Sequence, residues 1–273
     1  LFELDGRAPA IDTGRFRYEP FTADIESLNQ ASMRGELEIT AISCAQYPWV
    51  QDRYVLTACG CSMGDQYGPK LVSRRPMSME ELRSPEVTVA IPGTRTSAFG
   101  ALSVMLGPGT FQHEVVAFEA IIDRVCDGTF AAGLVIHEGQ LTFEQRGLKL
   151  IEDLGQWWTE RFALPLPLGI NVVRRDLEVR YGAGTLNEIA ATLAASVNHA
   201  LGHRAEGLAY ARTFGRGIDH ELTDRFVSMY VNRWTLDFGR RGFEAVEMFL
   251  KELERVGLTP KTQPLEVAGG VGV

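Results

Sequence analysis

The chain has only four cysteines, and they do not form a metal-binding pattern. Cys59 and Cys61 are separated by a single residue, Cys44 and Cys126 stand apart, and no Cys/His pair has the spacing usual for a closed zinc site. Free thiols in a reducing compartment are the favoured interpretation, so we expect a cytoplasmic protein with no bound metal.

Long apolar stretches and an excess of basic residues are also missing. No run approaches the roughly 18 apolar residues that cross a membrane, and no signal peptide is visible. The net charge of −8 argues against nucleic acid as a partner, because phosphate contacts need a concentrated basic face. A hydrophobic content of 45% and a charged content of 23% are those of an ordinary globular protein, which leaves a small molecule as the expected partner.

Strand-like and helix-like stretches alternate along the chain, which indicates an α/β fold. Residues 16–24, 54–62, 69–75, 86–91 and 131–136 are strand-like, and 186–258 are mostly helical. A helix is expected over 24–36, with Asp24 as its cap and its end near Gly35. We expect two lobes joined by a two-stranded hinge, with a ligand cleft at the carboxyl ends of the strands. One lobe comprises residues 1–86 and 171–273, and the other comprises residues 87–170.

The stretch "AAGLVIHEGQ" places a histidine and a glutamate directly after a buried strand. His137 and Glu138 would lie at the mouth of that strand, where a neutral imidazole can act as a general base. A histidine that merely ends the strand and bonds a loop is an equally weighted alternative. A metalloprotease helix is excluded, because a second histidine would have to stand where Leu141 is found.

Two further strand ends carry polar residues that could meet a ligand. In "IPGTRTSAFG", Thr96 and Ser97 begin a helix after a Pro-Gly turn, and hydroxyls and free amides there suit a carboxylate or phosphate. An ordinary helix cap is the simpler alternative, and there is no P-loop lysine. Ser43 follows the strand-like "LEITAI" without a Gly-x-Ser-x-Gly elbow, so we expect it to bond a ligand rather than to act as a nucleophile. His199 and His203 are one helical turn apart without a third metal ligand nearby, so we expect a solvated helix face.

Residues 133–177, "GLVIHEGQLTFEQRGLKLIEDLGQWWTERFALPLPLGINVVRRDL", resemble the 1,4-dihydroxy-6-naphthoate synthase family of the futalosine route to menaquinone. The Ile-His-Glu, Asp-Leu-Gly-x-Trp-Trp and Leu-Pro-Leu-Pro-Leu-Gly elements recur in the family's order and spacing. Further matches are "DIESLN" (24–29), "SAFG" after "IPGTRT", and "YVNRWTLDFG" (230–239). The likeness extends from about Asp24 to about Leu258.

The resemblance implies a two-lobed fold similar to periplasmic binding proteins (type II) and cleavage of cyclic dehypoxanthinyl futalosine without a cofactor. It implies that His137 is the catalytic residue. It also implies substrate contacts at Ala41, Ile42 and Ser43, and at the hydroxyl pair Thr96 and Ser97. Family sequences open with a strand and a Ser-x-Cys-Pro-Asn-Asp-Thr-Phe-like loop that has no equivalent after Leu1, so we expect that the natural start is missing here.

Two rival functions share the expected fold. The chorismate dehydratase of the same pathway lacks this Ile-His-Glu and Leu-Pro-Leu-Pro-Leu-Gly signature. An extracytoplasmic solute-binding protein would use the cleft only to hold a small organic acid, and would not need His137 and Glu138. The lyase is therefore the favoured reading, with the oligomeric state left open.

Overall fold

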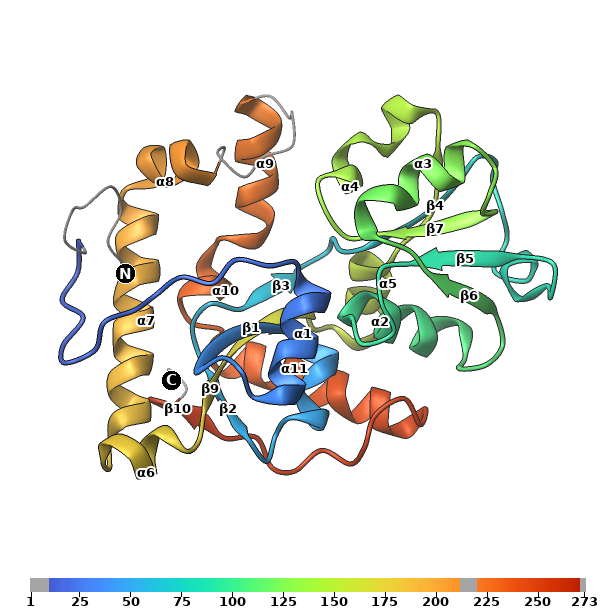
Figure 1. Ribbon diagram of the computed structural model, residues 1–273. Coiled ribbons are helices and arrows are strands. Elements are labelled where there is room, and N and C mark those ends of the chain that lie inside the picture. Colours follow the sequence, from blue (N-terminus) through green and yellow to red (C-terminus); the bar gives the residue numbers. More distant parts are fainter. Residues whose placement is uncertain (1–9, 212–219, 271–273) are drawn as a thin grey trace.

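The computed structural model of the protein describes residues 10–211 and 220–270, and the strands of this part form two five-stranded sheets (Figure 1). The first sheet has the order β1-β9-β2-β10, with β3 paired to β9, and its strands are β1 (Ile39–Ser43), β9 (Leu166–Arg174), β2 (Tyr54–Thr57), β10 (Val267–Ala268) and β3 (Ser62–Gly64). The second has the order β6-β5-β7-β4-β8, and its strands are β6 (Gln112–Val115), β5 (Thr88–Ile91), β7 (Ala132–Val135), β4 (Lys70–Ser73) and β8 (Lys149–Asp153).

Helices cover both sheets, and they dominate the chain after β9 as expected. Their bounds are α1 (Ile25–Arg34), α2 (Ser97–Leu106), α3 (Ile121–Cys126), α4 (Gly139–Thr142), α5 (Leu154–Phe162), α6 (Leu177–Tyr181), α7 (Thr185–Gly202), α8 (Arg204–Ala211), α9 (His220–Tyr230), α10 (Arg233–Leu236) and α11 (Gly239–Arg255). Short 3-10 turns, η1 (Cys44–Trp49), η2 (Glu81–Arg83), η3 (Phe118–Ala120) and η4 (Phe143–Arg146), complete the connections. The α/β prediction is confirmed.

Helix α1 begins and ends where its sequence predicts. The Asp24 carboxylate accepts hydrogen bonds from the main-chain N–H groups of Glu26 and Ser27. Gly35 adopts a left-handed conformation with φ of 67°, and its N–H bonds the carbonyl groups of the last turn. These caps fix the start of α1, and so the position of its buried residue Asn29.

Two features of the sequence-based assignment differ from the structure. Residues 16–24 do not form a strand, since Pro20 offers no N–H and Glu19 to Phe21 lie exposed. Strand β4 pairs with β7 and β8, so the change from the first sheet to the second falls between Gly64 and Lys70, not near residue 86. Periodicity identified β4 as a strand, but it contains no information about which partner a strand will choose.

One buried cluster of apolar side chains runs through both sheets. Helix α11 packs against β9 of the first sheet and against α2, which follows β5 of the second. Gly100 makes this approach close, because a Cβ atom there would lie 2.9 Å from a Leu253 methyl group and 3.2 Å from the Phe249 ring. The two sheets therefore share part of one core.

The edges of the two sheets that carry the predicted site are defined by strand direction. Strands β6, β5 and β7 are parallel, so their carboxyl ends lie at one edge of the second sheet. In the first sheet β1 runs antiparallel to β9, which places the end of β1 beside the beginning of β9. Residues from both edges meet around a single cavity.

Candidate active site

A cavity of about 180 Å³ lies between the two sheets. It is lined by residues of both, together with the start of α1 and the end of α9: Ile25, Ser43, Ser62, Pro69, Thr96, Ser97, Ala98, Ile136, Gln140, Leu168, Gly169 and Tyr230. The lining in the described part of the chain carries hydroxyls, an amide and apolar groups, without an ionised side chain. Three of the predicted residues, Ser43, Thr96 and Ser97, are brought together here although 53 positions separate Ser43 from Thr96.

The wall from the first sheet is a row of small residues in register. Gly169 of β9 is paired with Ser43 on one side and with Ser62 on the other. The Gly169 N–H donates to Ser62 Oγ over 2.9 Å. An added Cβ at Gly169 would lie 2.9 Å from the same oxygen, so a side chain here would displace the Ser62 hydroxyl. The glycine that ends the Leu-Pro-Leu-Pro-Leu-Gly element thus gives the cavity room.

Asn29 of α1 orients Ser43, and it was not among the predicted site residues. The Ser43 N–H donates to Asn29 Oδ1 over 2.9 Å, and Asn29 Nδ2 donates to Ser43 Oγ over 3.2 Å. Ser43 Oγ therefore acts as an acceptor toward Asn29 and keeps its own proton for a ligand. The "DIESLN" element contains Asn29, and its polar residue on the inner face of an amphipathic helix was the available signal.

The first turn of α2 forms the opposite wall. Thr96 Oγ1 donates to the Gly93 carbonyl oxygen over 2.8 Å and accepts from the Phe99 N–H over 3.2 Å, so it is the helix cap. Ser97 Oγ donates to the Leu168 carbonyl oxygen over 2.6 Å and accepts from the Ala45 N–H over 3.2 Å. Both hydroxyl protons are thus used within the protein. The N–H groups of Ser97 and Ala98, in the first helical turn, have no acceptor within the helix and can serve an anion.

Ala41 and Ile42 do not line the cavity. Ala41 is exposed on β1, and Ile42 is fully buried in the core. Residues alternate between the two faces of a strand, so only the last position of β1 reaches the edge where the cavity lies. Of the segment 41–43, the structure places Ser43 alone at the cavity.

His137 lies beside the cavity, two residues beyond the end of β7, while its neighbours Ile136 and Gln140 line it. The Gly139 N–H donates to His137 Nδ1 over 3.0 Å, which assigns the ring proton to Nε2, 2.9 Å from the Phe118 carbonyl oxygen. Glu138 Oε2 is 3.7 Å from Nδ1. In this arrangement both ring nitrogens are engaged by the main chain, so an approach to a ligand requires the imidazole to turn.

Gln140 and Tyr230 complete the cavity, and neither was predicted. Gln140 Nε2 donates to the Tyr230 hydroxyl over 2.7 Å. Burial raises the pKa of Tyr230 well above its ordinary value, so the phenol stays protonated near neutral pH. Tyr230 comes from α9, far along the chain, and the signal that could have found it is the "YVNRWTLDFG" element, of which it is the first residue.

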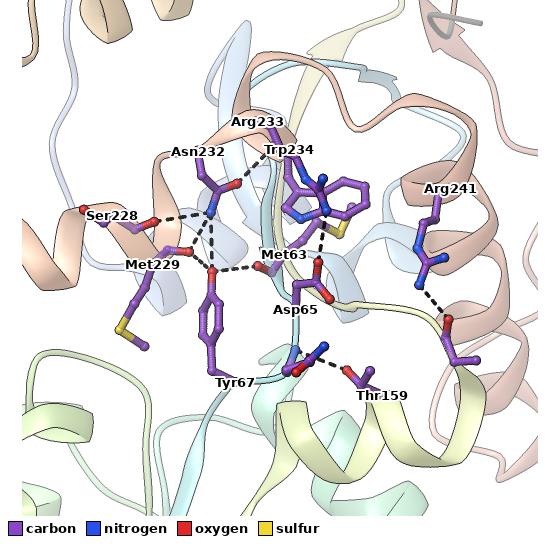
Figure 2. A network of polar contacts seen from close by, with 12 residues as sticks. Met63, Asp65, Tyr67, Thr159, Ser228, Met229, Asn232, Arg233, Trp234 and Arg241 are labelled. Atoms are coloured by element: carbon purple, nitrogen blue, oxygen red, sulfur yellow. Dashed lines mark hydrogen bonds and ion pairs between the residues drawn. The ribbon is translucent and has the colours of Figure 1, made fainter.

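The segment after α9 is attached to the connection between the sheets, which helps to position Tyr230. In Figure 2 the hydroxyl of Tyr67, in the connection from β3 to β4, donates to the carbonyl oxygen of Met229. It also accepts from Asn232 Nδ2 over 3.4 Å. Asn232 caps α10 by accepting from the Trp234 N–H. These contacts tie the residues on both sides of Tyr230 to the first crossing between the sheets.

A largely buried ion pair lies near this wall. Lys70 Nζ contacts the Asp153 carboxylate, which also accepts from the N–H groups of Gly155 and Gln156 at the start of α5. Lys70 is paired in register with Val135 at the end of β7. The positive charge is therefore balanced by its partner, and the site as a whole is close to neutral.

Two other places in the described part of the chain were candidates for a site, and neither combines a cavity with hydrogen-bonding groups from both sheets. A larger hollow of about 810 Å³ contains Arg34, Arg174 and Arg175, each paired with a carboxylate, and Arg53, whose guanidinium donates to the Met33 carbonyl oxygen. His199 and His203 stack with ring centroids 4.0 Å apart, and the described residues contain no group of three side chains able to hold a metal. In the same residues, every helix is too short or too polar to cross a bilayer.

A two-sheet α/β fold with a cavity between the sheets defines the class of periplasmic-binding-protein-like proteins. The alkanesulfonate-binding protein of Xanthomonas axonopodis pv. citri has this fold, with a TM-score of 0.62 at 11% identity over 86% of this chain and 80% of its own. A structure from Archaeoglobus fulgidus matches with a TM-score of 0.77 at 36% identity, covering 86% and 85% of the two chains.

Sequence comparison is more specific than the fold. A family model described as menaquinone biosynthesis matches residues 3–255. The 1,4-dihydroxy-6-naphthoate synthase of Thermus thermophilus is 39% identical over 91% of this chain and 88% of its own. The synthase of Streptomyces coelicolor is 32% identical over 94% and 87%. The chain belongs to the 1,4-dihydroxy-6-naphthoate synthase family of menaquinone biosynthesis, whose members are lyases, and the family predicted from the sequence is confirmed.

Proposed function

We propose that this chain converts cyclic dehypoxanthinyl futalosine to 1,4-dihydroxy-6-naphthoate in the cavity between its sheets, without a cofactor. The observation that carries the proposal is the convergence of Ser43, Ser97 and the His137 segment at one cavity, in a chain of this family. The two sheets act as two lobes that close on the substrate. The chain crosses from one lobe to the other between Gly64 and Lys70, and back between Asp153 and Leu166.

The substrate carboxylate binds at the start of α2. The N–H groups of Ser97 and Ala98 supply donors, and the positive end of the ten-residue helix favours a negative charge. The Ser97 hydroxyl, which bonds Leu168 of β9, holds this helix end against the first sheet. The hydroxyl of Ser43 contributes a further donor from the opposite wall. Thr96 supports the site as the helix cap, while Ala41 and Ile42 act only by placing Ser43 at the end of β1.

His137 is the general base. It removes a proton from the substrate once the ring turns away from Phe118, and the skeleton then fragments as the ring system becomes aromatic. Glu138, 3.7 Å from Nδ1, stabilises the imidazolium that results and does not itself react. General-base catalysis by a positioned imidazole contributes roughly 10²–10⁴-fold to a rate.

The protein works in the cytoplasm on a small molecule, with neither nucleic acid nor a membrane as partner. Its four cysteines are free thiols, three of them buried, as is usual in a reducing compartment. The two rival functions predict different results. A chorismate dehydratase would convert chorismate, and a solute-binding protein would bind the futalosine derivative without converting it.

The test is incubation of the purified protein with cyclic dehypoxanthinyl futalosine while the absorbance of the naphthoate product is followed. Product formation without added metal or cofactor, and none from chorismate, supports the lyase. Conversion of chorismate, or binding of the futalosine derivative without turnover by a folded protein, would assign the chain to one of the rival functions.

A further inference from the structure

Gln140 and Tyr230 form a polar pair in the cavity wall whose bonding capacity is only partly used. Gln140 is 2% exposed, and its Oε1 is buried without a hydrogen-bond partner among the described residues. A buried carbonyl oxygen without a donor costs free energy, so such an atom is usually satisfied by a water or a ligand. The atom therefore marks a position where a donor belongs.

The pair offers both a donor and an acceptor. With Gln140 Nε2 donating to the Tyr230 oxygen over 2.7 Å, the phenolic proton and Gln140 Oε1 both stay available. A donor and an acceptor also remain free if the Gln140 amide is flipped. Tyr230 then donates to Oε1, and the Tyr230 lone pair and the amide protons stay unused. A group that can donate and accept at once, which is what a hydroxyl does, matches this pair.

The chemistry of the cavity separates this pair from the carboxylate site. The start of α2 offers main-chain donors only, which suit an anion. The Gln140–Tyr230 pair carries no charge and includes an acceptor that would repel a carboxylate. Gln140 comes from α4 beside the second sheet and Tyr230 comes from α9 in the C-terminal half, so the hydrogen bond between them joins two distant segments of the chain in the cavity wall.

We propose that Gln140 and Tyr230 form a specificity subsite that binds a hydroxyl group of the substrate and a phenolic hydroxyl of the product. This proposal rests on the proposed function, because it assigns the opposite end of the ligand to the start of α2. The pair distinguishes a hydroxylated bicyclic acid from the same ring without hydroxyls.

The test compares the affinities of two ligands that share a carboxylate and a ring system. They are 1,4-dihydroxy-6-naphthoate and 2-naphthoate, which lacks both hydroxyls, with binding measured by calorimetry. A satisfied pair of neutral hydrogen bonds contributes about 10-fold or more to an affinity, so the parent protein binds the dihydroxy acid at least about 10-fold more tightly. In Gln140→Met the preference falls to within about 3-fold, while the affinity for 2-naphthoate changes little.

Two further variants complete the comparison. Tyr230→Phe keeps the ring and Gln140 Oε1, so we expect it to lose only part of the preference for the dihydroxy acid. A second variant of the pair is needed in case Gln140→Met has a folding defect. Gln156→Met removes another glutamine whose Nε2 is hydrogen-bonded, to Glu160 on α5, and keeps the full preference.

Outcomes against the proposal can be told apart. If the parent protein binds neither acid, the proposed function and the subsite are both wrong. If the parent prefers the dihydroxy acid and both cavity variants keep that preference, only the subsite is wrong.

Discussion

Asn29 and Ser43 form a reciprocal pair, in which the serine main chain donates to the amide oxygen over 2.9 Å and the amide nitrogen donates to the serine hydroxyl over 3.2 Å. Both residues are buried, with Asn29 fully so. Helix α1 thereby controls the geometry of Ser43, the last residue of β1. Asn29 does not line the cavity itself, but it determines the direction in which the Ser43 hydroxyl points.

Replacement of Asn29 should weaken the fold as well as the site. Asn29→Ala leaves the buried Ser43 N–H without its acceptor, so the free energy of unfolding should fall by about 1–3 kcal/mol. Urea denaturation measures this. Gln30→Ala, on the same helix but exposed, is the control and should stay within about 0.5 kcal/mol of the parent. Equal stability of Asn29→Ala and the parent would mean that water replaces the amide.

Replacement of His137 should remove catalysis without removing binding. His137→Asn should lower turnover by about 10²–10⁴-fold, while the protein stays folded and still binds the product. His203→Asn, an exposed histidine outside the cavity, serves as control. If His137→Asn keeps most of its activity, the base is another group.

The main-chain donors of α2 can be separated from the Ser97 hydroxyl. Thr96 has φ of −75° and ψ of 147°, a conformation that a following proline accepts, and Ser97 is the first helical residue, where proline is tolerated. Ser97→Ala removes the hydroxyl, whereas Ser97→Pro removes both the hydroxyl and the N–H. We expect a KM for Ser97→Pro about 10-fold above that of Ser97→Ala. Equal KM values would exclude this amide from carboxylate binding.

Stability should decrease at alkaline pH because buried acids are kept neutral. Burial raises the pKa of the Cys44 thiol well above its ordinary value of 9.0, and raises the pKa of Tyr47 to about 12. The unfolded chain ionises these groups first, so their contribution is complete below about pH 9 and is lost as pH rises toward their folded pKa values. Unfolding free energies at several pH values should decrease from about pH 9 upward, less steeply in Cys44→Ala. If the unfolding free energy of Cys44→Ala falls with pH as steeply as that of the parent, the Cys44 thiol does not contribute to the alkaline loss of stability.

The sequence predicted what depends on local pattern. Alternation and turn residues identified most strands, the Asp24 cap and the start of α2, and position after a strand led to Ser43, Thr96 and Ser97. Partner choice is not local, so the pairing of β4 with the second sheet was missed. Tyr230 was missed for the same reason, since it joins Gln140 across 90 positions of sequence. Strand alternation also explains why Ala41 and Ile42, adjacent to a cavity residue, lie outside the cavity.

The close passage of α2 across α11 at Gly100 has a consequence for how the molecule comes apart. Side chains from both sheets contribute to one buried cluster, so neither sheet can lose its packing while the other keeps all of its own. The protein should melt in a single cooperative calorimetric transition, not in two. Gly100→Val, which places a branched side chain against Leu253 and Phe249, should lower the melting temperature of the whole chain.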